Sequence, residues 1–168
     1  MITPEDFMNY KMVFYNVGRI LLVEAVLLAI PALVAIIYDE NTLISFAITI
    51  AALTVVGLSA TYKKPKKQSI YAKDGYVIVA FSWILMSLFG ALPFVISGHI
   101  PSFVDAFFET VSGFTTAGST ILREIESLPR SILFWRSFTH WIGGMGVLVF
   151  IMAFLPLSGG HNMHLMRA

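Results

Sequence analysis

The fold is decided by a short stretch that carries no charged side chain, Ser112-Gly113-Phe114-Thr115-Thr116-Ala117-Gly118-Ser119-Thr120. Apolar side chains recur before it at helical spacing, namely Phe103, Phe107, Val111 and Phe114. Ser102, followed three residues later by Asp105, is typical of a helix start. A helix over residues 103–112 would be roughly 15 Å long, about half of a hydrocarbon core of roughly 30 Å. The pattern therefore predicts a half-length helix that enters a membrane and returns as an extended segment.

The whole chain is too apolar for an ordinary water-soluble domain. Of its 168 residues 57% are hydrophobic and 12% are charged, and the mean hydropathy is +0.80. Soluble domains average about 45–50% apolar and about 25% charged residues. The net charge of +1 argues against a nucleic-acid partner, and the lack of cysteine excludes disulfides and thiolate metal sites. No catalytic triad, carboxylate pair or nucleotide-binding glycine motif can be assembled. We expect an all-α integral membrane protein that is not an enzyme and carries no organic cofactor.

Four stretches are candidates for membrane spans, residues 12–38, 42–62, 76–98 and 137–160. The first contains Arg19 and Glu24. Charged side chains are costly inside a membrane, and we favour structural pairing or snorkelling for both. Pro31 is expected to kink that span. The predicted organisation is a pair of transmembrane helices in residues 1–67, followed in residues 68–168 by one helix–re-entrant loop–helix unit.

The charges of the short loops predict the orientation. The loop between the second and third spans contains Lys63, Lys64, Lys66, Lys67 and Lys73. The loop before the second span contains Asp39 and Glu40 and no basic residue. Positive residues favour the cytoplasmic side, so the lysine loop and the N-terminus are expected there. The lysines are explained well enough by this topological role, without a dedicated lipid or partner site.

The residues after the half-helix are suited to a large monovalent cation. The C-terminus of a helix is partially negative, and here it would point into the bilayer. Neutral carbonyl and hydroxyl oxygens replace the hydration shell of K⁺ well, whereas a divalent ion would be expected to need carboxylates. Gly118 fits a backbone conformation that other residues resist. The candidate ligands are Thr115, Thr116, Ala117, Gly118 and Ser119. The alternative is a Thr/Gly-rich extracellular turn that binds no ion.

Four further residues are candidates for structural or gating roles around the loop. Gly143 and Gly146 lie three apart on the last span, where small residues allow close helix packing or, alternatively, a gating hinge. Arg136 at the outer end of that span is expected either to snorkel or to pair with Glu109 on the half-helix. Such a pair would hold the loop in place.

Two blocks of this sequence carry a family resemblance, Asp105-Ala106-Phe107-Phe108-Glu109-Thr110-Val111-Ser112-Gly113-Phe114-Thr115-Thr116-Ala117-Gly118-Ser119-Thr120 and Arg136-Ser137-Phe138-Thr139-His140-Trp141-Ile142-Gly143-Gly144-Met145-Gly146. They resemble the pore helix, filter and following helix of the Trk/Ktr/HKT superfamily of potassium transporters, most of all bacterial TrkH-type subunits. The resemblance implies K⁺ as the transported ion and residues 68–168 as the first of four pore repeats. Gly118 matches the central glycine of the potassium-channel filter pattern, whereas Ser119 and Thr120 depart from it.

The same resemblance implies an assembly. Members of the superfamily carry four repeats in one chain, so we expect a longer polypeptide whose remaining repeats complete the pore. It also implies a bacterial inner (cell) membrane location, with lipid around the chain, a homodimer and a cytoplasmic nucleotide-binding regulatory subunit of the TrkA/KtrA type. Two alternatives remain: a structural or accessory membrane protein that transports nothing, and a small channel made of four copies of this chain.

Overall fold

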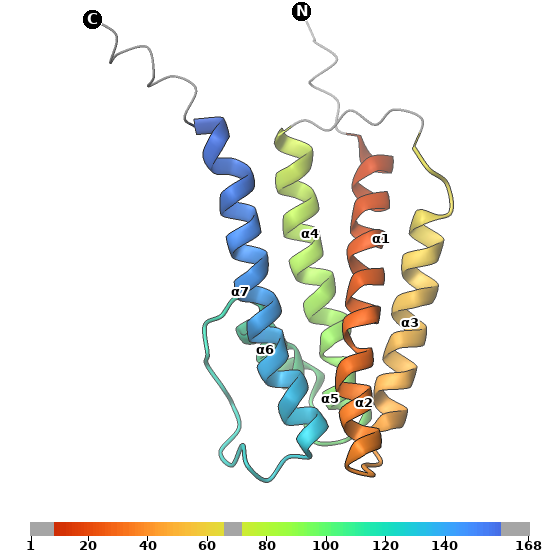
Figure 1. The fold of residues 1–168 in the computed structure, drawn as a ribbon, viewed down its shortest axis with the longest axis vertical. Helices are drawn as coiled ribbons and strands as arrows, with labels where there is room; N and C mark the ends of the chain where they lie inside the picture. The colour runs from red at the N-terminus through yellow and green to blue at the C-terminus, as the bar shows by residue number, and fades with distance from the viewer. Residues whose placement is uncertain (1–8, 66–71, 159–168) are drawn as a thin grey trace, which may run out of the picture.

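The computed structural model describes residues 9–65 and 72–158, and every regular element in these ranges is a helix. The helices are α1 (Tyr10–Leu27), α2 (Ala29–Ile37), α3 (Leu43–Thr61), α4 (Ala72–Gly90), α5 (Leu92–Ile96), α6 (Phe103–Phe114) and α7 (Arg130–Ser158). The long helices run side by side, and the shorter helix α6 lies beside one half of α7 (Figure 1). The all-α architecture expected from the sequence is confirmed.

Three segments of the described residues are long and apolar enough to cross a membrane: Tyr10–Ile37, Leu43–Thr61 and Lys73–Ile96. The first is broken at Leu28, where α1 ends and α2 begins. This break lies one turn before Pro31, which has no N–H to continue the ladder. Lys66 and Lys67 of the lysine loop lie outside the described residues.

The fourth predicted span lies within α7, whose 29 residues would be roughly 43 Å long. This helix begins at Arg130, two turns before the predicted start at residue 137. The extra turns have a physical cause that the local sequence does not contain. The Glu40 carboxylate, from the turn between α2 and α3, accepts hydrogen bonds from the backbone N–H groups of Arg130 (2.7 Å) and Ser131 (3.1 Å). A remote side chain thus caps the start of α7.

The N-terminal pair of helices packs through glycine. A Cβ atom on Gly18 of α1 would lie 2.6 Å from the Cβ atom of Ala60, and one on Gly57 of α3 would lie 2.7 Å from Leu22. Contacts this short mean that α1 and α3 approach too closely for a side chain at either glycine. Close backbone approach at small residues is how helices associate in lipid, where burial of apolar surface gives little driving force.

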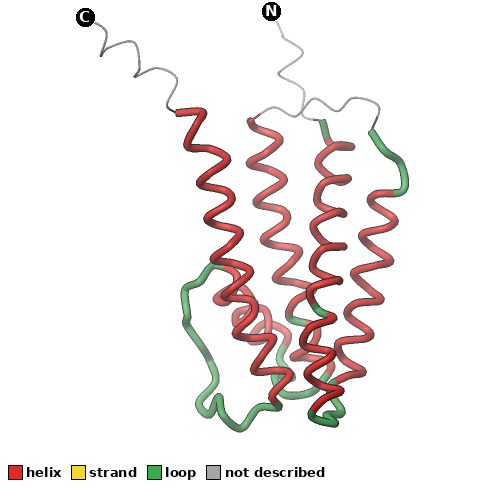
Figure 2. The backbone as a smooth tube through the Cα atoms, in the orientation of Figure 1, coloured by secondary structure: helices red, strands yellow, loops and turns green. Residues whose placement is uncertain are grey.

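The half-helix expected between the last two spans is α6. Ser102 caps it by accepting a hydrogen bond from the Asp105 N–H at 3.4 Å. Its 12 residues correspond to roughly 18 Å, which is too short to cross a bilayer. After Phe114 the chain leaves the helix and runs back as a loop to the start of α7, at the same end of the bundle from which it came (Figure 2). The predicted sequence of helix, half-helix with return loop, and helix is therefore present.

The main hydrophobic core takes buried side chains from α1, α2, α3, α5, α6 and α7, and partly buried side chains of α4 pack against it. Trp135 and Phe114 are fully buried, and their rings meet edge to face with centroids 6.3 Å apart. The indole N–H of Trp135 donates a hydrogen bond of 2.9 Å to the Gly90 carbonyl, at the point where α4 ends. Phe114 is the last residue of α6, so this core fixes the position from which the return segment starts.

The two ends of the bundle differ. The starts of α1 and α4 and the end of α3, with Lys63 and Lys64 just after it, lie at one end, which we call the lysine end (Figure 1). The loops around α6 lie at the other end. The return loop therefore opens on the side opposite the lysines.

Candidate functional site

The return segment begins with a tightly closed helix end. The Thr116 N–H donates to the Gly113 carbonyl at 2.9 Å, and the Ala117 N–H donates to the Ser112 carbonyl at 3.0 Å. These two bonds form the Schellman pattern that ends many helices, which needs a left-handed residue just after the cap. Here that residue is Thr116, with φ = 58°. The last turn of α6 is thus held by its own backbone.

Two residues of the candidate ligand set have left-handed backbone. Gly118 has φ = 73°, which agrees with the conformation expected for it from the sequence, and Thr116 has φ = 58°. A β-branched residue at positive φ is a genuine outlier, and strain of this kind costs about 1–3 kcal/mol. The chain therefore alternates left-handed and ordinary residues through the segment. Thr116 was not expected to be left-handed, because its side chain argues against it.

The candidate ligands are all accessible. Each of the residues 115–120 is exposed, and their side chains carry only hydroxyl or methyl groups or none. Nothing lies within 4 Å of the position that a Cβ atom on Gly118 would take. Among the described residues no group of three or more His, Cys, Asp or Glu side chains could hold a metal ion. The segment thus offers only neutral oxygen atoms, and its residues are exposed.

An ion pair holds the return segment against both neighbouring helices. The Arg136 Nε atom of α7 lies 3.0 Å from the Glu109 Oε2 atom of α6, with side-chain exposures of 14% and 1%. The other carboxylate oxygen accepts hydrogen bonds from the Thr120 hydroxyl (2.5 Å) and the Ile121 N–H (2.7 Å). The pairing expected between these residues is present, and it also captures the end of the return segment.

A second anchor holds the middle of the segment. The Ser112 hydroxyl on α6 donates a hydrogen bond of 2.7 Å to the Ser119 carbonyl. This bond occupies one of the two lone pairs of an oxygen from the candidate ligand set. Between the Schellman closure at Ala117 and the Glu109 bonds at Thr120, the backbone is therefore tied at three places. This role of Ser112 was not predicted, because nothing in the spacing of the sequence indicates it.

Glycines allow α6 to pack closely against α7. A Cβ atom on Gly143 of α7 would collide with the carbonyl group of Phe114, and one on Gly113 of α6 would collide with the Thr139 side chain. Gly146 lies against Trp83, because a Cβ atom on this glycine would be 3.2 Å from the indole ring. Close packing, one of the two interpretations of Gly143 and Gly146, is thus what the geometry supports, and the packing partner of Gly143 is the backbone from which the return segment starts.

The two charged residues of the first span find no partner within the described residues. Arg19 is exposed and has no ion pair or hydrogen bond there. Glu24 is fully buried, and neither of its carboxyl oxygens has a hydrogen-bond partner in this part of the chain. Its Oε1 atom lies near Gly90, which places it beside the core of Phe114 and Trp135. Pairing within residues 9–65 and 72–158 is therefore not how these two groups are accommodated.

Comparisons with known proteins give one consistent result. The family model TrkH, described as a cation transport protein, matches residues 38–168. The chain is 36% identical to the Trk system potassium uptake protein TrkH of Vibrio parahaemolyticus over 163 residues, which cover 96% of this chain and 34% of that protein. It is 40% identical to the Trk system potassium uptake protein TrkG of Escherichia coli over 131 residues, 77% of this chain and 27% of that protein.

A solved structure agrees with these sequence similarities. The crystal structure of the potassium transporter TrkH from Vibrio parahaemolyticus superposes with a TM-score of 0.84 at 35% sequence identity. The superposition covers 93% of this chain and 34% of that one. The chain thus spans about a third of the length of the curated relatives that it matches.

Proposed function

Because the chain belongs to the TrkH family of cation transport proteins, we propose that it forms one wall of a potassium uptake pore in the membrane. The proposal rests on the properties of the segment of residues 115–119. It is free of charge, left-handed at Thr116 and Gly118, and anchored on both sides to a half-helix. The names of the relatives, which are potassium uptake proteins, support K⁺ as the ion.

The proposed mechanism uses backbone oxygens as a substitute for water. A dehydrated K⁺ ion would be coordinated by carbonyl and hydroxyl oxygens of Thr115, Thr116, Ala117, Gly118 and Ser119. The bonds of Ser112 and Glu109 keep these oxygens from collapsing inward or swinging away. The similarity to potassium uptake proteins speaks against the alternative of an accessory or scaffold protein.

One such wall cannot surround an ion, so we propose that residues 68–168 act with further repeats of the same polypeptide. Residues 1–67 would be the helix pair that precedes them. The relatives are about three times as long as this chain, which leaves room for three more repeats. The rival assembly, four copies of this chain around one pore, would use the same segment with different partners.

The finer features of location and assembly are also proposals. The lysine end is assigned to the cytoplasm of a bacterial cell, across the inner membrane, by the charge of its loops. A homodimer and a nucleotide-binding regulatory subunit of the TrkA/KtrA type are proposed from the family alone.

The test compares two glycines with similar left-handed backbone. Gly118 and Gly98 both have positive φ, and a Cβ atom would meet nothing at either position. Only Gly118 lies in the candidate ligand segment. In the full-length protein, Gly118→Asp is expected to abolish rescue of growth at limiting K⁺ and uptake of the K⁺ analogue Rb⁺, while Gly98→Asp retains both. Wild-type uptake by Gly118→Asp at equal protein level in the membrane would refute the proposal.

A further inference from the structure

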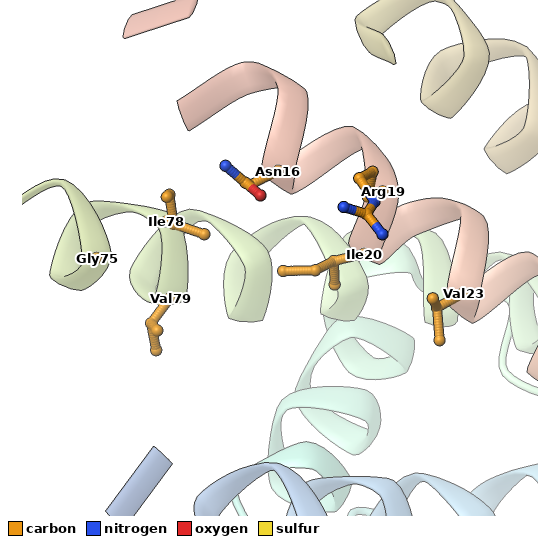
Figure 3. Close-up of a pocket in the computed structure, with 7 residues that line it drawn as sticks. All are labelled: Asn16, Arg19, Ile20, Val23, Gly75, Ile78 and Val79. Atoms are coloured by element: carbon orange, nitrogen blue, oxygen red, sulfur yellow. The ribbon is translucent and has the colours of Figure 1, made fainter. Parts of the chain in front are cut away.

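A small cleft on the lysine half of the bundle contains an arginine that has no partner among the described residues. It has a volume of about 420 Å³ and lies between α1, which supplies Asn16, Arg19, Ile20 and Val23, and α4, which supplies Gly75, Ile78 and Val79 (Figure 3). Of these lining residues only Arg19 is charged. Asn16 is already engaged, because its amide donates a hydrogen bond of 2.8 Å to the Met12 carbonyl.

The depth of Arg19 favours an anionic partner. It is the tenth residue of α1, roughly 14 Å from the start of a helix that crosses the membrane. A charge at such a position is costly unless it is paired or reaches the interface. The guanidinium group forms no ion pair within residues 9–65 and 72–158, although the long side chain can extend toward the lysine end.

The cleft continues into an apolar groove. Ile20, Val23 and Val79 line both spaces, and the groove of about 560 Å³ is completed by Trp83 and Met86 of α4 and by Ile142, Met145, Gly146 and Val149 of α7, with Ser82 as the polar residue. The Ser82 hydroxyl is used within its helix, since it donates to the Ile78 carbonyl at 2.7 Å. The groove therefore offers contact to hydrocarbon and no free hydrogen-bonding group at Ser82.

We propose that the cleft and groove together bind one anionic phospholipid, with its phosphate on Arg19 and one acyl chain in the groove. Two properties of the site select this ligand. A phosphate complements the guanidinium group of Arg19, which can hold it with two hydrogen bonds. An acyl chain attached to that phosphate would lie along the membrane normal, from the level of Gly75 toward Trp83, which is the direction in which the groove runs.

The two other occupants fit less well. A zwitterionic lipid fills the groove equally but brings a positive group close to Arg19. A segment from elsewhere in the longer polypeptide would need both a carboxylate at the depth of Arg19 and an apolar stretch of the right shape. The bound lipid would join α1 of the N-terminal pair to α4 and α7 of the pore repeat.

The experiment uses the full-length protein in nanodiscs made of phosphatidylglycerol and phosphatidylcholine in equal amounts. After mild detergent extraction, native mass spectrometry counts the lipids that remain bound. Wild-type protein is expected to retain phosphatidylglycerol preferentially. Arg19→Gln is expected to lower that retention about fivefold, the effect of removing one cation–lipid contact, while Arg19→Lys retains most of it. Arg123→Gln, which removes an exposed arginine from the outer loop, is the charge-matched control and should change nothing.

The groove is tested separately. Val79→Trp narrows both spaces and should release the same lipid, whereas Val55→Trp, on an exposed face of α3, should not. A photo-crosslinking residue at Val23, beside an intact Arg19, should capture phosphatidylglycerol. This arm needs no loss of charge, so it remains informative if Arg19→Gln fails to fold. Equal lipid retention by Arg19→Gln and wild type, or a crosslink to peptide in place of lipid, would overturn the proposal. Displacement by soluble glycerol phosphate alone would overturn the acyl-chain part.

Discussion

The Glu109 carboxylate lies 3.0 Å from the Arg136 Nε atom and, through its other oxygen, holds the backbone of Ile121. One buried side chain thus connects the half-helix α6, the helix α7 and the end of the return segment. The charge of Arg136 balances that of Glu109, and the hydrogen bonds of Thr120 and Ile121 use two further lone pairs. This arrangement satisfies a buried carboxylate and fixes the loop at the same time.

The first prediction concerns this pair. Glu109→Gln in the full-length protein should lower the free energy of unfolding by roughly 3 kcal/mol, because it leaves Arg136, whose side chain is only 14% exposed, without a counter-charge. The measurement is thermal unfolding in detergent, together with Rb⁺ uptake. Glu124→Gln, which removes an exposed carboxylate from the outer loop, is the control. Unchanged folding and uptake in Glu109→Gln would contradict the anchoring role.

The second prediction uses neighbouring glycines on α7. Gly143→Ala should impair uptake and cost about 1–3 kcal/mol, because the new methyl group collides with the Phe114 carbonyl at the end of α6. Gly144→Ala should be nearly silent, since its methyl group would meet only the Thr116 methyl at 4.0 Å. Uptake by membrane vesicles and unfolding temperature measure both effects. Equal behaviour of the two variants would mean that the close approach at Gly143 has no consequence.

The third prediction concerns the strained threonine. Thr116→Gly should raise stability by about 1 kcal/mol, because glycine adopts positive φ without strain. The same change should weaken discrimination between K⁺ and Na⁺, since the segment becomes less rigid. Thr115→Gly is the comparison: Thr115 has ordinary helical backbone, so glycine there should destabilise by roughly 0.5–1 kcal/mol. Unfolding temperature and competition of Na⁺ with Rb⁺ uptake test the pair of variants. A stability loss in both would count against strain at Thr116.

The fourth prediction contrasts two buried carboxyl groups. Glu24 has no hydrogen-bond partner in the described structure, unlike Glu109. Glu24→Met, which keeps the shape and removes the polar atoms, should therefore leave stability unchanged or raise it by about 1 kcal/mol or more. Thermal unfolding of the full-length protein measures the change. A clear loss of stability would show that Glu24 has a partner outside residues 9–65 and 72–158.

The fifth prediction is a pH dependence at the cap of α7. Partial burial pushes the pKa of Glu40 upward, but hydrogen bonds from Ser131, Arg130 and Thr42 outweigh it, and the pKa lies below its usual value. A carboxyl group with a lowered folded pKa contributes stability above its unfolded pKa of about 4.3 and loses it as pH falls through the folded value. Unfolding temperature should therefore drop below about pH 4 more steeply in wild type than in Glu40→Gln. Parallel curves for both proteins would contradict this account of the cap.

Much of the fold follows from local patterns. The apolar stretches predict the long helices because backbone groups in lipid must be satisfied within one segment. Ser102, Asp105 and the spacing of the phenylalanines predict α6, and Gly118 predicts a left-handed position, because these signals act over a few residues. The break before Pro31 and the pairing of Glu109 with Arg136 were also within reach, since proline acts locally and a charge in an apolar segment needs a partner.

Other features depend on contacts between residues far apart in the chain. Glu40 extends α7 by two turns from 90 residues away, and its acidic loop otherwise predicts only orientation. In the sequence Ser112 and Thr139 are ordinary small polar residues. Their contacts arise only because α6 and α7 cross at Gly113. Likewise, positive φ at Thr116 opposes the preference of its own side chain and persists only because three surrounding anchors hold it.

The sequence by itself therefore determined that this is a helical membrane protein with a charge-free return loop, because hydrophobic length, capping and glycine act locally. Only the tertiary structure decided how that loop is held: by a buried ion pair, a hydrogen bond from a serine and close packing at glycines. These depend on which side chains meet when the helices pack, and packing is a property of the whole bundle.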